Sequence, residues 1–301
     1  MGAPGRIVLG SRGSELALTQ ARMVEQALRS AWPGLKVATE IVRTSGDEAS
    51  RSALAIDRKA GRKGLFTREI EKELLVRRID VAIHSAKDLP SERVEELEVR
   101  ASLPRANTED ILVTKNGASL TSLPAGATIA TGSIRRQRQL GWQRPDLEVV
   151  DLRGNVPTRL RKLHENKNWS GIILARAGLE RLALSVAGEI LAPDIFVAAG
   201  GQGVIALQTR RDDEPISNLI EAINHQPTHV CLRAEREFLR LLGGDCDSPV
   251  GVQARLDGDA LVLRAQIFET DRAEPRMATA SGRASEGEAI AKQLMAKLYG
   301  G

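Results

Sequence analysis

The sequence has few cysteines and few aromatic residues. Its two cysteines, Cys231 and Cys246, cannot make the disulfide framework of a small secreted protein. Aromatic residues are 3% of the chain, which leaves little surface for stacking on nucleic-acid bases. No signal-peptide pattern and no apolar run long enough to cross a bilayer is present. We therefore expect a cytoplasmic protein with no membrane and no nucleic-acid partner.

Common cofactor and metal motifs are also missing. The four histidines have no zinc-binding spacing, so no metal is expected. The glycine-rich run 200–203 matches neither a phosphate-binding loop nor a dinucleotide fingerprint. The net charge of +4 is mild for 301 residues. It suits a small anionic substrate at least as well as a nucleic acid.

The length and the alternation of strand and helix signals predict more than one α/β domain. A first set of strands and helices lies between residues 6 and 103, and we expect a mostly parallel sheet covered by helices. A long charged segment, Thr44–Gly64, has no clear period and is expected to be a functional loop. A linker at Leu103–Asn107 leads to a second set of strands. The strands expected in the two sets are Arg6–Leu9, Val37–Val42, Asp80–Ile83, Ile111–Thr114, Ala127–Ala130, Leu147–Leu152 and Gly171–Ala175, with a helix at Thr67–Arg78.

The last part of the chain has a different pattern. The glycines at 200–203 are expected to form a hinge back to the first domain. A helix is expected at His229–Leu242, followed by a hairpin of Val252–Leu256 and Leu261–Ile267. A closing helix is expected at Glu286–Leu298.

Two clusters of arginines follow strands that run into helices. Arg135 and Arg136 come just after Ala127–Ala130, and Arg153 and Arg159 come just after Leu147–Leu152. The first backbone N–H groups of a helix attract anions, and guanidinium groups beside them can hold carboxylates or phosphates. Arginines at such positions can also merely solvate a surface. The matching placement of two clusters favours a site for a ligand with several acidic groups.

Asp88 lies in the run His84–Pro90, at the end of an expected strand, with Lys87 beside it. Open α/β sheets bind ligands at that edge, where a carboxylate can stabilise a cation or move a proton. A turn or helix-capping aspartate is the alternative.

Cys246 and Cys231 occupy different settings. Cys246 lies in a tight segment after Gly243 and Gly244, which suit the left-handed end of a helix. Its acidic neighbours disfavour a thiolate, yet a thiol that reacts with an electrophilic carbon needs no activation. An ordinary loop cysteine is the alternative. Cys231 shares a helical stripe with Ala234 and is expected in a core.

Several segments, in order along nearly the whole chain, are similar to those of the hydroxymethylbilane synthase (porphobilinogen deaminase) family. They are Ser11–Ser14, Lys63–Phe66, His84–Pro90, Ser133–Gln137, Leu152–Val156, Ala175–Leu179, Gly201–Gly203, Glu235–Arg236 and Gly244–Cys246. The resemblance implies a transferase of heme biosynthesis that joins four porphobilinogen units into the linear tetrapyrrole hydroxymethylbilane and releases ammonia. The chain would grow on a dipyrromethane cofactor joined to Cys246 by a thioether.

The resemblance also implies a fold. It predicts two lobes like those of periplasmic binding proteins, the first one discontinuous, and a smaller α+β domain. These would be residues 1–103 with 200–221, residues 106–197, and residues 225–301. The protein is expected to be a monomer.

The resemblance assigns roles to particular residues. Asp88 would be catalytic, holding pyrrole N–H groups and stabilising the cation formed as ammonia leaves. The cofactor would be held by Ser85, Lys87, Asp88, Thr131, Ser133, Arg135, Arg136, Arg153, Arg159, Ala175 and Gln202, besides Cys246. Substrate or growing chain would be held by Arg12, Ser14, Arg153, Arg159 and Arg181. The 44–64 segment would be a mobile lid, with Lys59, Lys63 and Phe66 near the entrance.

One rival interpretation uses the same arginines. A non-catalytic two-lobed receptor for an anion would need neither the chemistry of Asp88 nor a loop cysteine. A nucleic-acid binder is more distant and would show steeply salt-dependent association.

Overall fold

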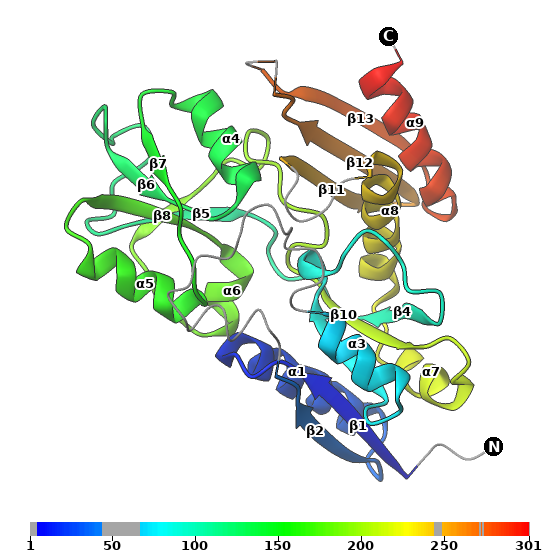
Figure 1. Cartoon of the computed structure of the whole chain (residues 1–301). Helices are drawn as coiled ribbons and strands as arrows, with labels where there is room; N and C mark the ends of the chain where they lie inside the picture. Colours follow the sequence, from blue (N-terminus) through cyan, green and yellow to red (C-terminus); the bar gives the residue numbers. More distant parts are fainter. Residues whose placement is uncertain (1–4, 44–66, 244–248, 271, 273, 301) are drawn as a thin grey trace.

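The computed structural model describes residues 5–43, 67–243, 249–270, 272 and 274–300. Within these ranges the chain forms two five-stranded sheets and one three-stranded sheet. Figure 1 shows the second lobe (green) on one side, the first lobe below it, and the third domain (orange and red) beside both.

The first lobe is built on the sheet β2-β1-β3-β10-β4. Its strands are β1 (Arg6–Ser11), β2 (Lys36–Ile41), β3 (Val81–Ser85), β4 (Leu97–Ser102) and β10 (Ile205–Arg210). Helices α1 (Glu15–Ala31) and α7 (Glu214–Glu221) pack on one face, through residues such as Leu28 and Ile216. Helix α3 (Arg68–Leu75) covers the other face with Ile70 and Leu74. The 3-10 turn η2 (Ala86–Asp88) follows β3 directly.

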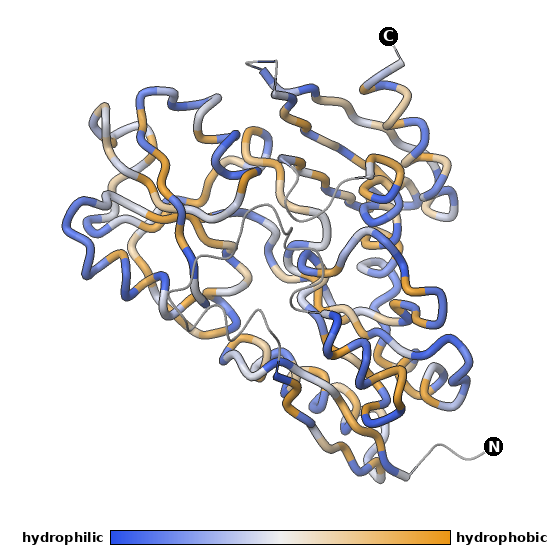
Figure 2. The backbone as a smooth tube through the Cα atoms, viewed as in Figure 1, coloured by the Kyte–Doolittle hydropathy of each residue, from blue (hydrophilic) through white to orange (hydrophobic). Residues whose placement is uncertain are grey.

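The second lobe repeats this plan with the sheet β7-β6-β8-β5-β9. Its strands are β5 (Asp110–Thr114), β6 (Thr128–Ala130), β7 (Glu148–Val150), β8 (Trp169–Ala175) and β9 (Gly188–Ile190). Helix α4 (Ile134–Gln143) packs on one face through Leu140. Helices α5 (Val156–Glu165) and α6 (Arg176–Arg181) pack on the other through Leu163 and Leu179. Figure 2 shows hydrophobic residues along the central strands of this lobe and hydrophilic ones along its outer loops.

Strand direction follows one rule in both lobes. The first three strands of each sheet order are parallel to one another, whereas β10 is antiparallel to both β3 and β4, and β5 is antiparallel to both β8 and β9. Four strands of each sheet therefore point the same way and one is reversed. The reversed strand is in each case the first after the chain crosses between lobes. The expected mostly parallel sheet is confirmed, with this one reversal that the sequence pattern does not reveal.

The third domain is an antiparallel sheet covered by two helices. Strands β11 (Val250–Asp257), β12 (Ala260–Ile267) and β13 (Arg276–Arg283) form the sheet. Helices α8 (Gln226–Leu242) and α9 (Gly287–Tyr299) pack on it around the fully buried Phe238. The short turn η3 (Ala284–Glu286) connects β13 to α9. Cys231 is buried in this core, as expected, and burial raises its pKa to about 11. Gly243 has a φ of 65° at the end of α8, which confirms the left-handed helix end.

Some expected elements differ from the structure. The helix expected at Thr67–Arg78 ends at Leu75, because the chain turns at Arg77, whose φ is 59°. Strands β4, β9, β10 and β13 were not expected. Two of them, β9 and β13, are largely exposed and lack the apolar alternation that marks a strand.

The carboxylate of Glu235, on α8, joins all three parts of the protein. It accepts hydrogen bonds from Arg105 Nη1 at 2.6 Å and from the backbone N of Gly201 and Ala254 at 2.7 Å each. Arg105 lies on the segment that leaves the first lobe, and Gly201 lies on the segment that returns to it. Glu235 is 0% exposed, so this junction is a buried one. No helix among the described residues is both long and apolar enough to cross a bilayer.

Candidate active site

On the first lobe, the candidate site forms where β3 ends. Ser85 is the last residue of β3, and its hydroxyl exchanges hydrogen bonds with the side-chain amide of Gln20 at 2.9 and 3.1 Å. Lys87 and Asp88 follow in η2. Gly201 lies against this turn with a φ of 74°, and a Cβ there would come within 2.9 Å of Ala86. The hinge glycine therefore allows the returning segment to contact the turn that carries Lys87 and Asp88.

On the second lobe, two helix N-termini lie side by side at the matching edge. Ser133 caps α4 and Asn155 caps α5, each accepting a bond from a backbone N–H of its helix. Thr131 is buried, and its backbone N donates to Val150 O at 2.9 Å. A Cβ on Gly132 would meet Leu152 O at 2.6 Å, so the ends of β6 and β7 approach closely. The two arginine clusters of the sequence thus meet at one edge of the sheet.

Arg135 and Arg136 are buried and share one carboxylate. Arg135 Nη1 lies 2.8 Å from Asp110 Oδ2, and Arg136 Nη2 lies 2.7 Å from Asp110 Oδ1. Asp110 is 0% exposed at the start of β5. Burial opposes ionisation of this carboxyl, but the two guanidinium groups outweigh it and hold its pKa well below the usual range.

Lys87 brings the two lobes into electrostatic contact. Its pKa is lowered to about 8, chiefly by burial and also by Arg136 and Arg135, while Asp88 and Asp110 oppose the shift. Lys87 and Asp88 belong to the first lobe, whereas Asp110 and the two arginines belong to the second. The basic groups of both lobes therefore face one another across the interface between them.

Gln202 and Arg181 lie where the hinge meets the second lobe. The side-chain amide of Gln202 donates to Asp110 Oδ1 at 2.8 Å and to Thr108 O at 2.6 Å. Arg181, at the end of α6, donates from Nη2 to Gly203 O at 2.8 Å. Burial lowers the pKa of Arg181. Ala175 precedes α6 and is paired in register with Asp110.

The other arginines are less buried. Arg153 donates from Nε to Asp151 at 2.7 Å, and its side chain is 37% exposed. Arg159 donates from Nε to Gly154 O at 2.7 Å. Arg12 and Ser14 lie between β1 and α1, where the Ser14 hydroxyl caps the helix by accepting from Ala17 N.

Four residues that the sequence singles out lie outside the described residues: Cys246, Lys59, Lys63 and Phe66. The chain after the cysteine segment is described from Pro249. A Cβ on Gly251 would meet Val197 O at 2.5 Å, and Val197 O accepts a bond from Arg135 Nη1 at 2.9 Å. The segment that follows Cys246 in sequence therefore enters β11 beside the arginine pair.

The donors present fit a ligand with acidic side chains, such as dipyrromethane. Arg135 Nε and Arg136 Nε are buried and have no hydrogen-bond partner in the described part of the chain. An unpaired buried donor carries a desolvation penalty of about 1–3 kcal/mol, which a carboxylate partner would remove. No group of three His, Cys, Asp or Glu residues that could hold a metal ion occurs in these same ranges.

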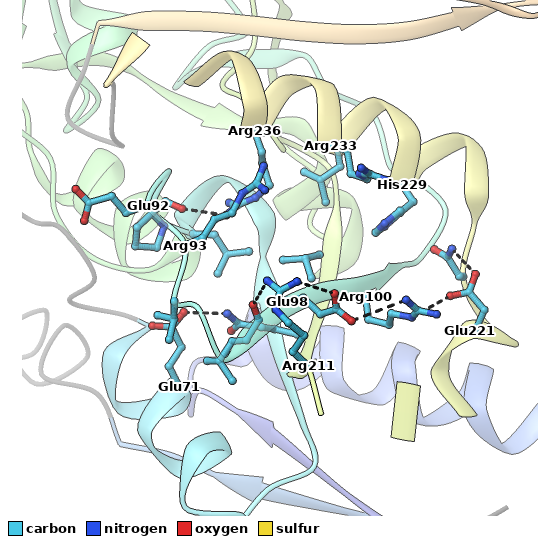
Figure 3. Close-up of a pocket in the computed structure, with 18 of the residues that line it drawn as sticks. Glu71, Glu92, Arg93, Glu98, Arg100, Arg211, Glu221, His229, Arg233 and Arg236 are labelled. Carbon is cyan, nitrogen blue, oxygen red and sulfur yellow. Dashed lines mark hydrogen bonds and ion pairs between the residues drawn. The ribbon is translucent and has the colours of Figure 1, made fainter. Parts of the chain in front are cut away.

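A separate groove of about 420 Å³ lies between the first lobe and α8 (Figure 3). None of the candidate site residues lines it. Its arginines are largely engaged: Arg100 pairs with Glu98 and Glu221, and Arg93 pairs with Glu237. The groove is a mixed-charge surface between domains and is distinct from the edge that carries Lys87.

A buried polar chain runs from this groove to the strand that carries the site. Glu71 accepts from Gln208 Nε2 at 3.0 Å, and Gln208 Oε1 lies 2.9 Å from His84 Nε2. Burial lowers the pKa of His84 to about 4, so its ring is neutral at pH 7. Burial raises the pKa of Glu71.

Asp110 and Gln20 were missed from the sequence, and Glu235 was noted only as part of a family-like segment, without its role at the junction. Asp110 directly precedes the apolar run Ile111–Val113. A carboxylate at the start of a buried strand needs a cationic partner, and this was the signal in the sequence that could have revealed it. Gln20 and Glu235 lie on amphipathic helices, where helical periodicity alone does not distinguish them from surface residues.

The fold and the site define a two-lobed α/β protein whose facing sheet edges carry basic side chains suited to a ligand with several acidic groups. The profile "Porphobilinogen deaminase, dipyromethane cofactor binding domain" matches residues 7–218, and "Porphobilinogen deaminase, C-terminal domain" matches residues 229–300. The chain therefore belongs to the porphobilinogen deaminase family. It is a transferase of tetrapyrrole biosynthesis with a dipyrromethane cofactor-binding domain, as the sequence predicted.

Relatives match over nearly the whole length. The porphobilinogen deaminase of Moorella thermoacetica is 45% identical over 97% of this chain and 92% of its own. That of a Roseiflexus species is 45% identical over 96% of this chain and 95% of its own. Among solved structures, the methionine-binding protein MetQ is similar with a TM-score of 0.45 and 14% identity, over 73% of this chain and 90% of that one.

Proposed function

We propose that the facing edges of the two lobes form the site where four porphobilinogen units are joined into hydroxymethylbilane with loss of ammonia. One observation carries this proposal. Lys87 of the first lobe, which interacts with its neighbour Asp88, lies within electrostatic reach of Arg135 and Arg136 of the second. One carboxylate amid cationic groups suits a reaction in which positive charge develops on a ring that carries acidic side chains.

Asp88 is the catalytic residue in this proposal. Its carboxylate accepts hydrogen bonds from pyrrole N–H groups and so orients the reacting ring. The same carboxylate stabilises the positive charge that develops on the substrate ring as ammonia leaves. The neighbouring Lys87 ammonium holds an acidic side chain of the ligand, which keeps Asp88 available for the ring nitrogen.

The cofactor is held covalently and ionically. Cys246 supplies the thioether sulfur, and Arg135 and Arg136 offer their unpaired Nε–H groups to carboxylates. When bound, dipyrromethane supplies the terminal ring to which the first substrate unit is joined. The remaining cofactor ligands are Ser85, Lys87, Asp88, Thr131, Ser133, Arg153, Arg159, Ala175 and Gln202.

Incoming substrate and the growing chain are held by a second set of residues, which shares Arg153 and Arg159 with the cofactor set. These are Arg12, Ser14, Arg153, Arg159 and Arg181, with the 44–64 segment as a lid and Lys59, Lys63 and Phe66 near the entrance. The functional units are residues 1–103 with 200–221, residues 106–197, and residues 225–301. The protein acts as a cytoplasmic monomer on porphobilinogen.

The intact mass of the purified, denatured protein tests the proposal. Protein made in cells that produce porphobilinogen should carry the additional mass of two pyrrole units, and Cys246→Ser should carry none. A wild-type chain without additional mass would favour a non-catalytic anion receptor and count against the enzyme.

A second variant tests Asp88. Asp88→Ala should melt like the wild type, because the side chain lies in a short turn at the site, and should make tetrapyrrole at least about 100-fold more slowly. Substantial turnover by this variant would remove Asp88 from the catalytic role.

A further inference from the structure

We infer that Asp110 is a positioning residue, which aims the Arg135 and Arg136 side chains at the acidic groups of the cofactor. The inference rests on the proposed function and adds to it a residue that does not itself touch the ligand. Asp110 lies at the start of β5, 25 positions before Arg135 in sequence, and no motif marks it.

The geometry of the pair supports this role. Asp110 contacts a terminal nitrogen of each guanidinium group, Arg135 Nη1 and Arg136 Nη2. The other contacts of these terminal nitrogens go to Val197 O, Gln139 Oε1 and Ile173 O. Each side chain is thus fixed by its terminal nitrogens, and the buried Nε atoms are left without a partner in the described residues. An arginine fixed in this way loses less side-chain freedom when a carboxylate binds to Nε–H.

Charge gives Asp110 a second effect. Two buried guanidinium groups repel each other, and one shared carboxylate reduces their net charge from two to one. Asp110 also bonds Gln202 on the hinge, which keeps the carboxylate in place from the side of the first lobe. The pair therefore stays oriented before any ligand arrives.

Asp110 acts on Lys87 as well. Among the described residues, the charged groups that act on Lys87 include Asp88 in its own turn, Arg135 and Arg136 on α4, and Asp110 on β5. Asp110 helps to keep Lys87 protonated, so removal of its charge should lower the pKa of Lys87 below about 8. A purely structural ion pair elsewhere in the protein would not produce this change.

The experiment measures how fast protein without the primer acquires it from porphobilinogen, by intact mass, as a function of pH. For Asp110→Asn, loading should be at least about tenfold slower than in the wild type, the equivalent of one charged hydrogen bond. The pH above which loading declines should also fall by about one pH unit. Asp110→Glu keeps the charge but displaces the carboxylate, so its loading should be slower with the pH limit unchanged.

Glu235→Gln is the matched control. Glu235 is equally buried and also pairs with an arginine, but its partners are Arg105 and the hinge backbone. This variant should melt at a lower temperature and keep the wild-type pH limit. If Asp110→Glu is the only Asp110 variant that folds, primer loading by this variant at the wild-type rate would overturn the inference.

Two outcomes separate the inference from the function on which it rests. Wild-type loading that proceeds normally, together with an unchanged rate and pH limit in Asp110→Asn, would overturn the role of Asp110 alone. A wild-type protein that never acquires the primer would overturn the proposed function itself.

Discussion

Removal of the Glu235 carboxylate should weaken the whole protein, because three separate parts of the chain donate to it. The carboxylate accepts hydrogen bonds from the Arg105 guanidinium group at 2.6 and 3.2 Å, and from the backbone N–H groups of Gly201 and Ala254. In Glu235→Gln the volume is kept, but each of these partners is a donor, so the new amide N–H₂ would face N–H groups. The Arg105 side chain, which is only 13% exposed, would also lose its counter-charge.

The magnitude follows from the cost of breaking a buried ion pair by removing one partner, about 3–5 kcal/mol. Unfolding entropy is about 2.1 cal/mol/K per residue, so 301 residues give roughly 0.63 kcal/mol/K. Dividing the first number by the second predicts a fall in Tm of about 5–8 °C. Differential scanning calorimetry of wild type and variant measures it directly.

Glu288→Gln is the control for this measurement. Glu288 Oε1, on α9, lies 3.9 Å from Arg233 Nη2, on α8, and both side chains are more than 60% exposed. Its loss should leave Tm unchanged, because solvent screens exposed ion pairs. A Tm for Glu235→Gln within about 1 °C of wild type would refute the view that this buried carboxylate holds the junction together.

Three further predictions concern the site and its surroundings. His84 has a pKa lowered by burial to about 4, so the unfolded chain binds more protons between pH 4 and 6.5, and stability should fall by roughly 3 kcal/mol as the pH drops through that range. Stability measured by urea unfolding at several pH values should depend less on pH in His84→Gln than in the wild type. An identical pH dependence would contradict the assignment. Lys87 has a pKa of about 8, so primer loading should decline above that pH in the wild type and persist to higher pH in Lys87→Arg; equal profiles would argue against a charge role. Gly201→Ala should lower stability by roughly 1–3 kcal/mol and slow turnover, because its φ is 74° and the new Cβ would press on Ala86 and Lys87; a normal melt and normal activity would contradict this.

Much of the fold could be predicted because it depends on local pattern. The apolar strands that run into arginine-bearing helices were visible in sequence, and the helices begin close by, at Ile134 and Val156. The two segments that connect the lobes were visible in the sequence, as the Pro-containing linker at 103–107 and the glycine run at 200–203. The reversal of β5 and β10 was not predictable, since strand direction depends on where the chain re-enters a sheet and leaves no mark on side-chain alternation.

The candidate site likewise contains residues that the sequence indicated and residues that only the folded structure brings together. Lys87, Asp88, Arg135 and Arg136 stood out because they follow strand ends. Asp110 did not, because its importance comes from a partner 25 residues away that only the folded sheet brings near. The roles of the individual residues toward substrate and cofactor stay predictions until the variants above are measured.

The position of β10 has a consequence for the order in which the protein can mature on the ribosome. This strand lies between β3 and β4, inside the first sheet, yet it is synthesised after the entire second lobe. The second lobe, whose strands follow one another from Asp110 to Ile190, can complete its core while the first lobe, made up to Ser102, still lacks β10. We therefore expect translation arrested before residue 205 to yield a protease-resistant fragment from the middle of the chain and a protease-sensitive beginning.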